Sequence, residues 1–325
     1  MMIFVQGFSW GNEALDRQLE MVRNFLNSEA QGSQDYVGLE ISRVLGSRGK
    51  LFRPALVLLS SKLGNKAVAN IIEFAAAIEM IHLATLIHDD VIDGAHSRRG
   101  EPALHIKIGG ARAVLAGDWL LARALSISGS HFDAELFSFL SERFEELCKA
   151  EINQDASSGK LVVSREEYLQ RVDGKTSALL RLSCRVGASV AGADLPVLNT
   201  LDRWAFIVGR AFQMDDDTLD YQGQQNHLDG SNSADLRAGL STLPLIIAWE
   251  SGDSKIRELT RNGIPSSRRK RRQIRKKVIG LGAVELARKE TAALYQKAHN
   301  HALLLPSTGP QDFGIIVNRL MGRSY

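Results

Sequence analysis

Cysteine is scarce in this chain of 325 residues, which contains only Cys148 and Cys184. Neither lies in the Cys and His spacing of a metal site, so we predict two buried, reduced thiols without a chemical role. The N-terminal residues lack a basic segment followed by a sustained apolar run. No later apolar stretch is expected to be long enough to cross a bilayer. The sequence therefore predicts a cytoplasmic protein.

An excess of either charge is also absent, because 40 Lys and Arg residues stand against 37 Asp and Glu residues, a net charge of +3. This balance argues against nucleic acid as the main partner, so any site for a polyanion must be local. The composition is 44% hydrophobic and 24% charged, which is typical of a globular protein with a substantial core.

Proline is rare, with seven residues and none between positions 103 and 195. Apolar residues recur at spacings of three and four in segments 136–154 and 200–221, as in amphipathic helices. Strand-like alternation is nearly absent. A capping box at Ser164–Glu167 and a looser signal at Asn199–Asp202 predict helix starts. Because neither a linker-like tract nor a fixed-period repeat is present, we predict one all-α domain over residues 1–325.

Two acidic segments share the spacing D-D-x-x-D. The first holds Asp89, Asp90 and Asp93, and the second holds Asp216, Asp217 and Asp220. On a helix, the first and last aspartates of each segment are four residues apart and project from one face. One such pattern is a weak signal, because it can arise by chance, whereas two in one chain are a strong signal.

Carboxylates this close repel one another and stay ionised together only when cations lie among them. Two carboxylate sets suit hard divalent ions, and Mg²⁺ commonly takes one or two carboxylates and completes its shell with water and phosphate oxygens. The segments therefore predict bound Mg²⁺ and a diphosphate ligand held by it.

An ordered series of motifs now gives a resemblance. The series runs "RGKLFRP", "AAIEMIHLATLIHDDVID", "RRGEPALH", "AVLAGDWLLARAL", "VDGKTSALL", "GRAFQMDDDTLDY", "DLRAGLSTLPLI" and "GLGAVELARKETAALYQKA". It resembles the all-trans polyprenyl diphosphate synthases of the isoprenyl diphosphate synthase family, long-chain type. The resemblance covers nearly the whole chain.

That resemblance implies the isoprenoid synthase fold, with antiparallel helices around a central apolar cavity. It further implies an Mg²⁺-dependent prenyltransferase that condenses isopentenyl diphosphate head to tail with farnesyl or geranylgeranyl diphosphate. A homodimer is implied as well. Alternatives remain open: a short-chain farnesyl or geranylgeranyl diphosphate synthase, a catalytically silent regulatory subunit of a partner synthase, and a terpene cyclase of the same fold.

The site roles are likewise implied by the resemblance. The residues that would bind the diphosphate of isopentenyl diphosphate are Lys50, Arg53, His82 and Arg99. Arg98 and Lys175 would face the allylic diphosphate, and all six aspartates would hold its metal ions. Thr176 and Gln213 would direct oxygen dipoles at the carbocation. Arg forks and a Lys point charge suit a phosphate that arrives without its own metal.

Two leucines depart from the family pattern, since Leu51 and Leu240 stand where basic residues are frequent. The departure at Leu240 is interpreted as a subtype feature of long-chain members.

Product length is expected to depend on residues one and two turns before Asp89. Thr85 and Ile81 lie beneath that aspartate by helical periodicity, and the resemblance adds Ala84, where short-chain members carry a bulky aromatic. Small residues at positions 84 and 85 predict a product longer than geranylgeranyl diphosphate.

One further segment, the basic run over residues 266–277, carries more positive charge than a helix face needs. Peripheral contact with an anionic membrane is one interpretation, and a solvated helix face is the other.

Overall fold

The structure is a computed structural model. It describes residues 9–31, 36–45, 49–98, 100–129, 131–157, 159–161, 163–222, 233–306 and 309–322. The first helices are α1 (Glu13–Gln31), α2 (Tyr36–Leu45), α3 (Phe52–Ser61), α4 (Ile71–Ile92), α5 (Leu104–Ile108), α6 (Gly110–Ser128), α7 (Ala134–Ser157) and α8 (Arg165–Val172). After the π-helical turn η1 (Asp173–Ser177) come α9 (Ala178–Val190), α10 (Leu195–Gln222), α11 (Ala234–Arg237), α12 (Leu243–Glu250), α13 (Ser254–Leu259), α14 (Arg268–Gly280), α15 (Ala283–Ala302) and α16 (Gly309–Met321).

The strands within this described part are β1 (Ser97–Arg98) and β2 (Glu101–Pro102), which pair antiparallel. The all-α prediction is therefore confirmed. Contacts divide the chain into two compact units, and we describe each by itself. Unit 1 comprises Met1–Phe139, Leu182–Asp202 and Leu305–Ile315, and unit 2 comprises Leu140–Arg181, Arg203–Leu304 and Ile316–Tyr325. The single domain over residues 1–325 stays a prediction.

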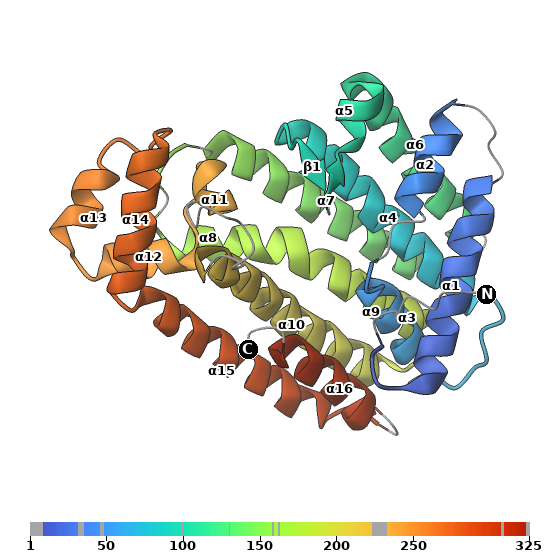
Figure 1. Cartoon of the computed structure of the whole chain (residues 1–325). Helices are drawn as coiled ribbons and strands as arrows, with labels where there is room; N and C mark the ends of the chain where they lie inside the picture. The colour runs from blue at the N-terminus through green and yellow to red at the C-terminus, as the bar shows by residue number, and fades with distance from the viewer. Residues whose placement is uncertain are drawn as a thin grey trace, which may run out of the picture. The chain divides into compact units, whose positions relative to one another are not determined.

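Helix α4 forms the centre of unit 1, where it packs against α6, α3 and α1 (Figure 1). Every residue from Phe74 to Ile81 is buried, and all of them except Glu79 are apolar, as expected for a helix in a protein core. Contrary to the sequence expectation, α4 is long and apolar enough to cross a membrane. However, 61% of its apolar window is buried inside the protein, as in a core helix.

The core of unit 2 is formed where α12, α14 and α15 pack together (Figure 1). Its buried residues include Tyr168, Met214, Tyr221, Ile246 and Ile274. Met214 and Tyr221 lie on either side of the second acidic segment, so core packing fixes the part of α10 from which its carboxylates project.

The helix starts were predicted with mixed success. Ser164 caps α8, because its hydroxyl accepts a hydrogen bond from the backbone NH of Glu167 at 3.3 Å, as the capping box predicted. The start predicted at Asn199–Asp202 is wrong. Helix α10 begins at Leu195, since Asp194 accepts from the NH of Val197 at 3.0 Å and Pro196 suits a first turn.

The two cysteines differ in exposure. Cys184 is buried, and burial raises the pKa of its thiol to about 12, which makes it unreactive as predicted. Cys148 is exposed, so the prediction of burial is wrong there. It lies on the outward face of α7 with Glu145, Lys149 and Ile152, since Cys148, Lys149 and Ile152 follow Glu145 by three, four and seven residues.

A close approach between α10 and η1 prepares the site in unit 2. A Cβ atom on Gly209 would lie only 2.6 Å from Cα of Ser177, so a side chain at position 209 would push the two elements apart. Thr176 on η1 and Gln213 on α10 are thereby held within hydrogen-bonding distance of each other.

Candidate functional site

The first acidic segment lies at the C-terminal end of α4. The backbone NH of Asp93 donates to the carbonyl of Asp89 at 2.8 Å, so the helical spacing predicted for these two residues is present. Asp89 is half-buried, Asp90 is buried and Asp93 is exposed. Asp89 and Asp93 therefore form the more open pair of carboxylates.

Arg98 supplies the cation that the crowded carboxylates require. Its Nε donates to both carboxylate oxygens of Asp90, at 3.0 and 3.2 Å, and its Nη2 contacts the same group. Burial works against the charged form of Arg98, but Asp90, together with the charges of Asp89 and Asp93, outweighs it and raises the pKa of the guanidinium. The β1–β2 pair presents this arginine. Arg99 lies outside the described residues.

The residues predicted to bind the second diphosphate lie on α3, on α4 and just before α3. Lys50 is exposed and lies two residues before α3, Arg53 lies in the first turn of α3, and His82 lies on α4, which packs against α3. Leu51 has a left-handed backbone (φ +49°) and is 4% exposed. Leu51 therefore anchors the chain in the core, between the exposed Lys50 and the half-buried Arg53.

The predicted chain-length residues differ in exposure. Ile81 and Ala84 are buried, at 2% and 0% exposure. Thr85 is half-buried, as are His82 and Asp89 on the same helical face, and its hydroxyl donates to the carbonyl of His82 at 2.8 Å. Thr85 thus lies on the more open face of α4, and Ala84 lies on a fully packed one.

A continuous hydrogen-bond chain leads to the second acidic segment, on α10. The Thr176 hydroxyl donates to Oε1 of Gln213 at 2.5 Å, and Nε2 of Gln213 donates to Asp217 at 2.8 Å. The Tyr168 hydroxyl donates to the other oxygen of Asp217 at 2.8 Å. Burial raises the pKa of Asp217, while the hydrogen bonds from Gln213 and Tyr168 act against that rise.

Asp220 serves as an anchor for the short helix α11. Its carboxylate accepts from the backbone NH of Ala234 at 2.8 Å and of Asp235 at 3.1 Å, and from the hydroxyl of Ser233, which itself caps α11. Burial raises the pKa of Asp235 well above its usual value, and the charges of Asp217 and Asp220 raise it further. The carboxyl groups here are so crowded that a divalent cation would relieve their repulsion.

Lys175 lies on η1 and makes a 2.7 Å ion pair with Glu151 of α7. Short π-helical segments within α-helices occur frequently at functional sites. The turn is also tightly packed, because a Cβ atom on Gly174 would come within 2.6 Å of the Cβ atom of Ala150. Lys175 is therefore presented by a firmly held segment.

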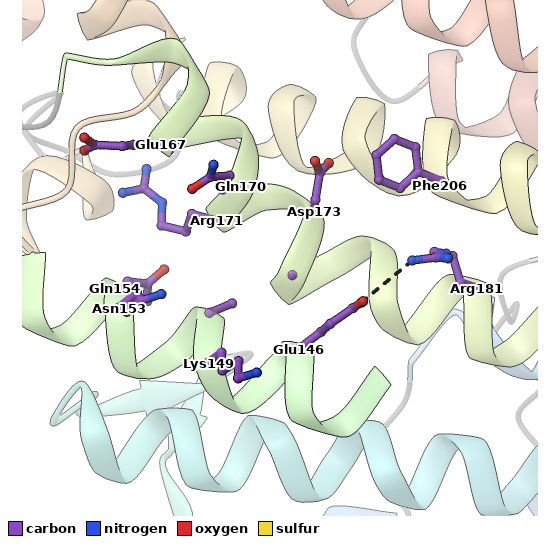
Figure 2. A pocket seen from close by; sticks show the side chains of 12 residues that line it. Glu146, Lys149, Asn153, Gln154, Glu167, Gln170, Arg171, Asp173, Arg181 and Phe206 are labelled. Carbon is purple, nitrogen blue, oxygen red and sulfur yellow. Dashed lines mark ion pairs between the residues drawn. The ribbon is translucent and has the colours of Figure 1, made fainter. Parts of the chain in front are cut away.

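A groove of about 540 Å³ lies on unit 2, between α7 and α8 (Figure 2). Its lining residues are Glu146, Lys149, Ala150, Asn153, Gln154, Glu167, Gln170, Arg171, Asp173, Gly174, Arg181 and Phe206. Ion pairs join Glu146 to Arg181 (3.7 Å) and Asp173 to Arg210 (2.6 Å). None of the site residues predicted from the sequence lines this groove, and two of its charged lining residues, Glu146 and Arg181, are paired with each other.

The acidic segments fit a hard divalent metal by the chemistry of their oxygen donors. In the described residues, no three Asp, Glu, His or Cys side chains converge as a ready-made metal site. The carboxylate oxygens of the two segments are nevertheless the type of donor that hard divalent cations prefer.

Tyr168, Ser233 and Asp235 are site residues that the sequence analysis missed. Tyr168 precedes the predicted ligand Lys175 by seven residues, two helical turns, which places both on one side of a helix. That spacing was a usable signal. Ser233 and Asp235 gave none, because their role depends on how α11 folds back onto α10.

Comparison with known proteins identifies relatives. The sequence model of the polyprenyl synthetase family matches residues 37–280. The heptaprenyl diphosphate synthase component 2 of Geobacillus stearothermophilus is 34% identical over 234 residues, which are 72% of this chain and 73% of that protein. The nonaprenyl diphosphate synthase of Mycobacterium tuberculosis is 34% identical over 233 residues, which are 71% of this chain and 69% of that one.

At least one solved structure has a fold similar to that of this chain. The polyprenyl synthase from Caulobacter crescentus CB15, complexed with calcium and isoprenyl diphosphate, has a TM-score of 0.86 and 28% sequence identity. The alignment covers 98% of this chain and 100% of that one.

The hydrogen bond from Tyr168 to Asp217 can be tested by mutation. Tyr168→Phe keeps the ring but removes the hydrogen bond that orients Asp217, so it should weaken divalent-metal binding about 10–100-fold and cost about 1 kcal/mol of stability. The measurement is the Mg²⁺ concentration that half-saturates the rise in melting temperature in the presence of inorganic diphosphate. Tyr295→Phe, at another buried tyrosine of unit 2, is the control. Equal metal affinity in wild type and Tyr168→Phe would contradict the orienting role.

Proposed function

The chain belongs to the polyprenyl synthetase family of prenyltransferases, and we propose that it condenses isopentenyl diphosphate head to tail with farnesyl or geranylgeranyl diphosphate, yielding a long-chain all-trans polyprenyl diphosphate. The observation that carries the proposal is the pair of D-D-x-x-D segments, each at the end of a helix and each tied into a network of hydrogen bonds. Heptaprenyl and nonaprenyl synthases among the relatives support a long product.

Mg²⁺ is the proposed metal, and when bound it neutralises the charge that develops on the departing diphosphate. Asp90, Asp217 and Asp220 each use both carboxylate oxygens for protein donors. We therefore propose that these donors orient Asp90, Asp217 and Asp220, and that all six aspartates of the two segments contribute oxygens to the metal.

Residues of the chain then position the organic reactants. Lys175 and Arg98 would bind the allylic diphosphate, and both already make ion pairs that limit their mobility. Thr176 uses its proton to hold Gln213, so the lone pairs of its hydroxyl oxygen remain to stabilise an allylic cation. The double bond of isopentenyl diphosphate attacks that cation, and a proton then leaves to the released diphosphate.

The cations assigned to isopentenyl diphosphate separate this proposal from a terpene cyclase, which has no second diphosphate to bind. Lys50 and Arg53 flank the buried Leu51, and His82 lies on the adjoining helix. Arg and Lys are well suited to bind a diphosphate that carries no metal of its own.

The deciding experiment incubates the purified chain with farnesyl diphosphate, labelled isopentenyl diphosphate and Mg²⁺, and separates the products by length. Asp89→Asn and Asp216→Asn should each lower turnover by several orders of magnitude without unfolding the protein, because each removes a metal contact and little volume. Asp202→Asn, on the same helix as Asp216, is the matched control and should keep wild-type turnover. Absence of any prenyl product with Mg²⁺, Mn²⁺ or Co²⁺ would refute the proposal.

A second candidate is a subunit that acts only with a partner. One observation favours it: the Geobacillus relative is named as component 2 of its synthase. If the purified chain made product only after a second protein was added, this candidate would replace the first.

We expect side chains on α4 to control the length of the product. Ala84→Tyr places a ring beneath the first acidic segment and should shorten the product by several isoprene units, while turnover of the first condensation is kept. Because Ala84 is fully buried, the ring can also disturb packing. Thr85→Tyr, at the half-buried neighbour, tests the same path with less strain. If both variants fold and neither changes the product distribution, the assignment of these positions is wrong.

We further propose a homodimer. Helix α6 exposes Leu115 (64%) and Trp119 (37%) one turn apart, an apolar face on the surface of unit 1. Light scattering should give twice the chain mass for wild type, and Leu115→Asp should shift the protein toward the monomer. Leu304→Asp, at a leucine of similar exposure (67%), is the control and should remain dimeric. A monomeric wild type would exclude the proposal.

A further inference from the structure

Positive charge is concentrated in one segment of unit 2. Residues 259–284 contain nine Lys and Arg residues and no Asp or Glu. Since the whole chain has a net charge of +3, the remainder of the sequence carries a net charge of −6 once these nine are set aside. The basic segment therefore stands out against an otherwise acidic protein.

Most of this charge belongs to α14, which is fastened to unit 2 on one side. Ile274 and Val278 are fully buried in the core. Arg275 donates to the carbonyl of Tyr221 at 2.8 Å, and Lys277 makes a 2.9 Å ion pair with Asp253. Arg271 donates to the carbonyl of Pro265 at 3.3 Å. Folding thus uses these three cations to attach the helix.

The opposite side of α14 carries cations that the attachment does not use. Arg269, Arg272 and Lys276 are exposed, and their spacings of three and four residues align them along one face. That face lies opposite Ile274 and Val278, at about 100° of rotation per residue. Ile279, 38% exposed, extends the same side of the helix toward its C-terminus.

We propose that this face of α14, defined by Arg269, Arg272 and Lys276, docks the protein on an anionic lipid bilayer. The helix spans about 20 Å, so a flat, negatively charged surface can meet all three side chains at once. Each Lys or Arg near such a surface contributes roughly 1 kcal/mol. The purpose of docking rests on the proposed function, because a long polyprenyl product is insoluble in water and must enter a membrane.

The test is co-sedimentation of the full-length protein with 100-nm vesicles at about 0.1 M salt. Vesicles of phosphatidylcholine with 30 mol% phosphatidylglycerol are compared with vesicles of phosphatidylcholine alone. Wild type should bind only the anionic vesicles, and added salt should release it. The triple variant Arg269→Gln, Arg272→Gln, Lys276→Gln should bind about a hundredfold more weakly.

The matched control is Lys66→Gln, Lys289→Gln, Lys297→Gln, which removes the same charge from exposed lysines elsewhere. It should retain binding within a few-fold of wild type. Equal loss in both variants would mean that net charge alone controls binding, and would overturn the docking face. Failure of wild type to bind anionic vesicles would overturn it as well, as would binding of a DNA duplex through the same residues in place of vesicles.

Turnover measured without vesicles distinguishes the docking proposal from the proposed function. The α14 variant should condense the soluble substrates at the wild-type rate, with unchanged KM values. A raised KM for either diphosphate would place these cations in the substrate site and overturn the inference. Vesicle binding by a chain that forms no product would instead leave the docking face standing and refute the proposed function.

Discussion

Electrostatic repulsion among carboxylates is the constraint on which the organisation of both helix ends depends. Each acidic segment crowds three aspartates within about one helical turn, and such groups stay ionised only if opposite charge or donors surround them. In unit 1, Arg98 meets this need at Asp90. In unit 2, Tyr168 and Gln213 meet it at Asp217, and the N-terminus of α11 meets it at Asp220. Local folding at both ends thus follows from the need to stabilise negative charge.

The compensation is partial, and this is what makes the segments chemically useful. Protein donors hold the carboxylates of Asp90, Asp217 and Asp220, whereas Asp93 is exposed to solvent. Burial raises the pKa of Asp235, and the nearby charges of Asp217 and Asp220 raise it further, so the carboxyl groups around the second acidic segment still repel one another. A divalent ion carried in with a diphosphate would complete the compensation, so substrate binding and charge neutralisation would be one event.

Sequence reasoning succeeded where the signal was local and periodic. Helical spacing predicted the relation between Asp89 and Asp93, and the capping box predicted the start of α8 at Ser164. It failed where a stronger neighbour competed, as at α10, whose start is set by Asp194 and not by Asn199. The partners of Asp217 and Asp220 could not be predicted in full. The spacing of Tyr168 from Lys175 does not identify Asp217 as its partner, and Ser233 reaches Asp220 only through tertiary packing.

Leu51 shows how a departure from a family pattern can be explained physically. A basic residue in its place would have to leave the core, since the position is 4% exposed, and the left-handed backbone there is costly for any residue with a Cβ atom. The burial of an apolar side chain offsets that cost and fixes the turn before α3. Lys50 and Arg53 lie on either side of this buried leucine. Leu51 therefore removes one basic side chain from the family pattern but anchors the backbone that carries the other two.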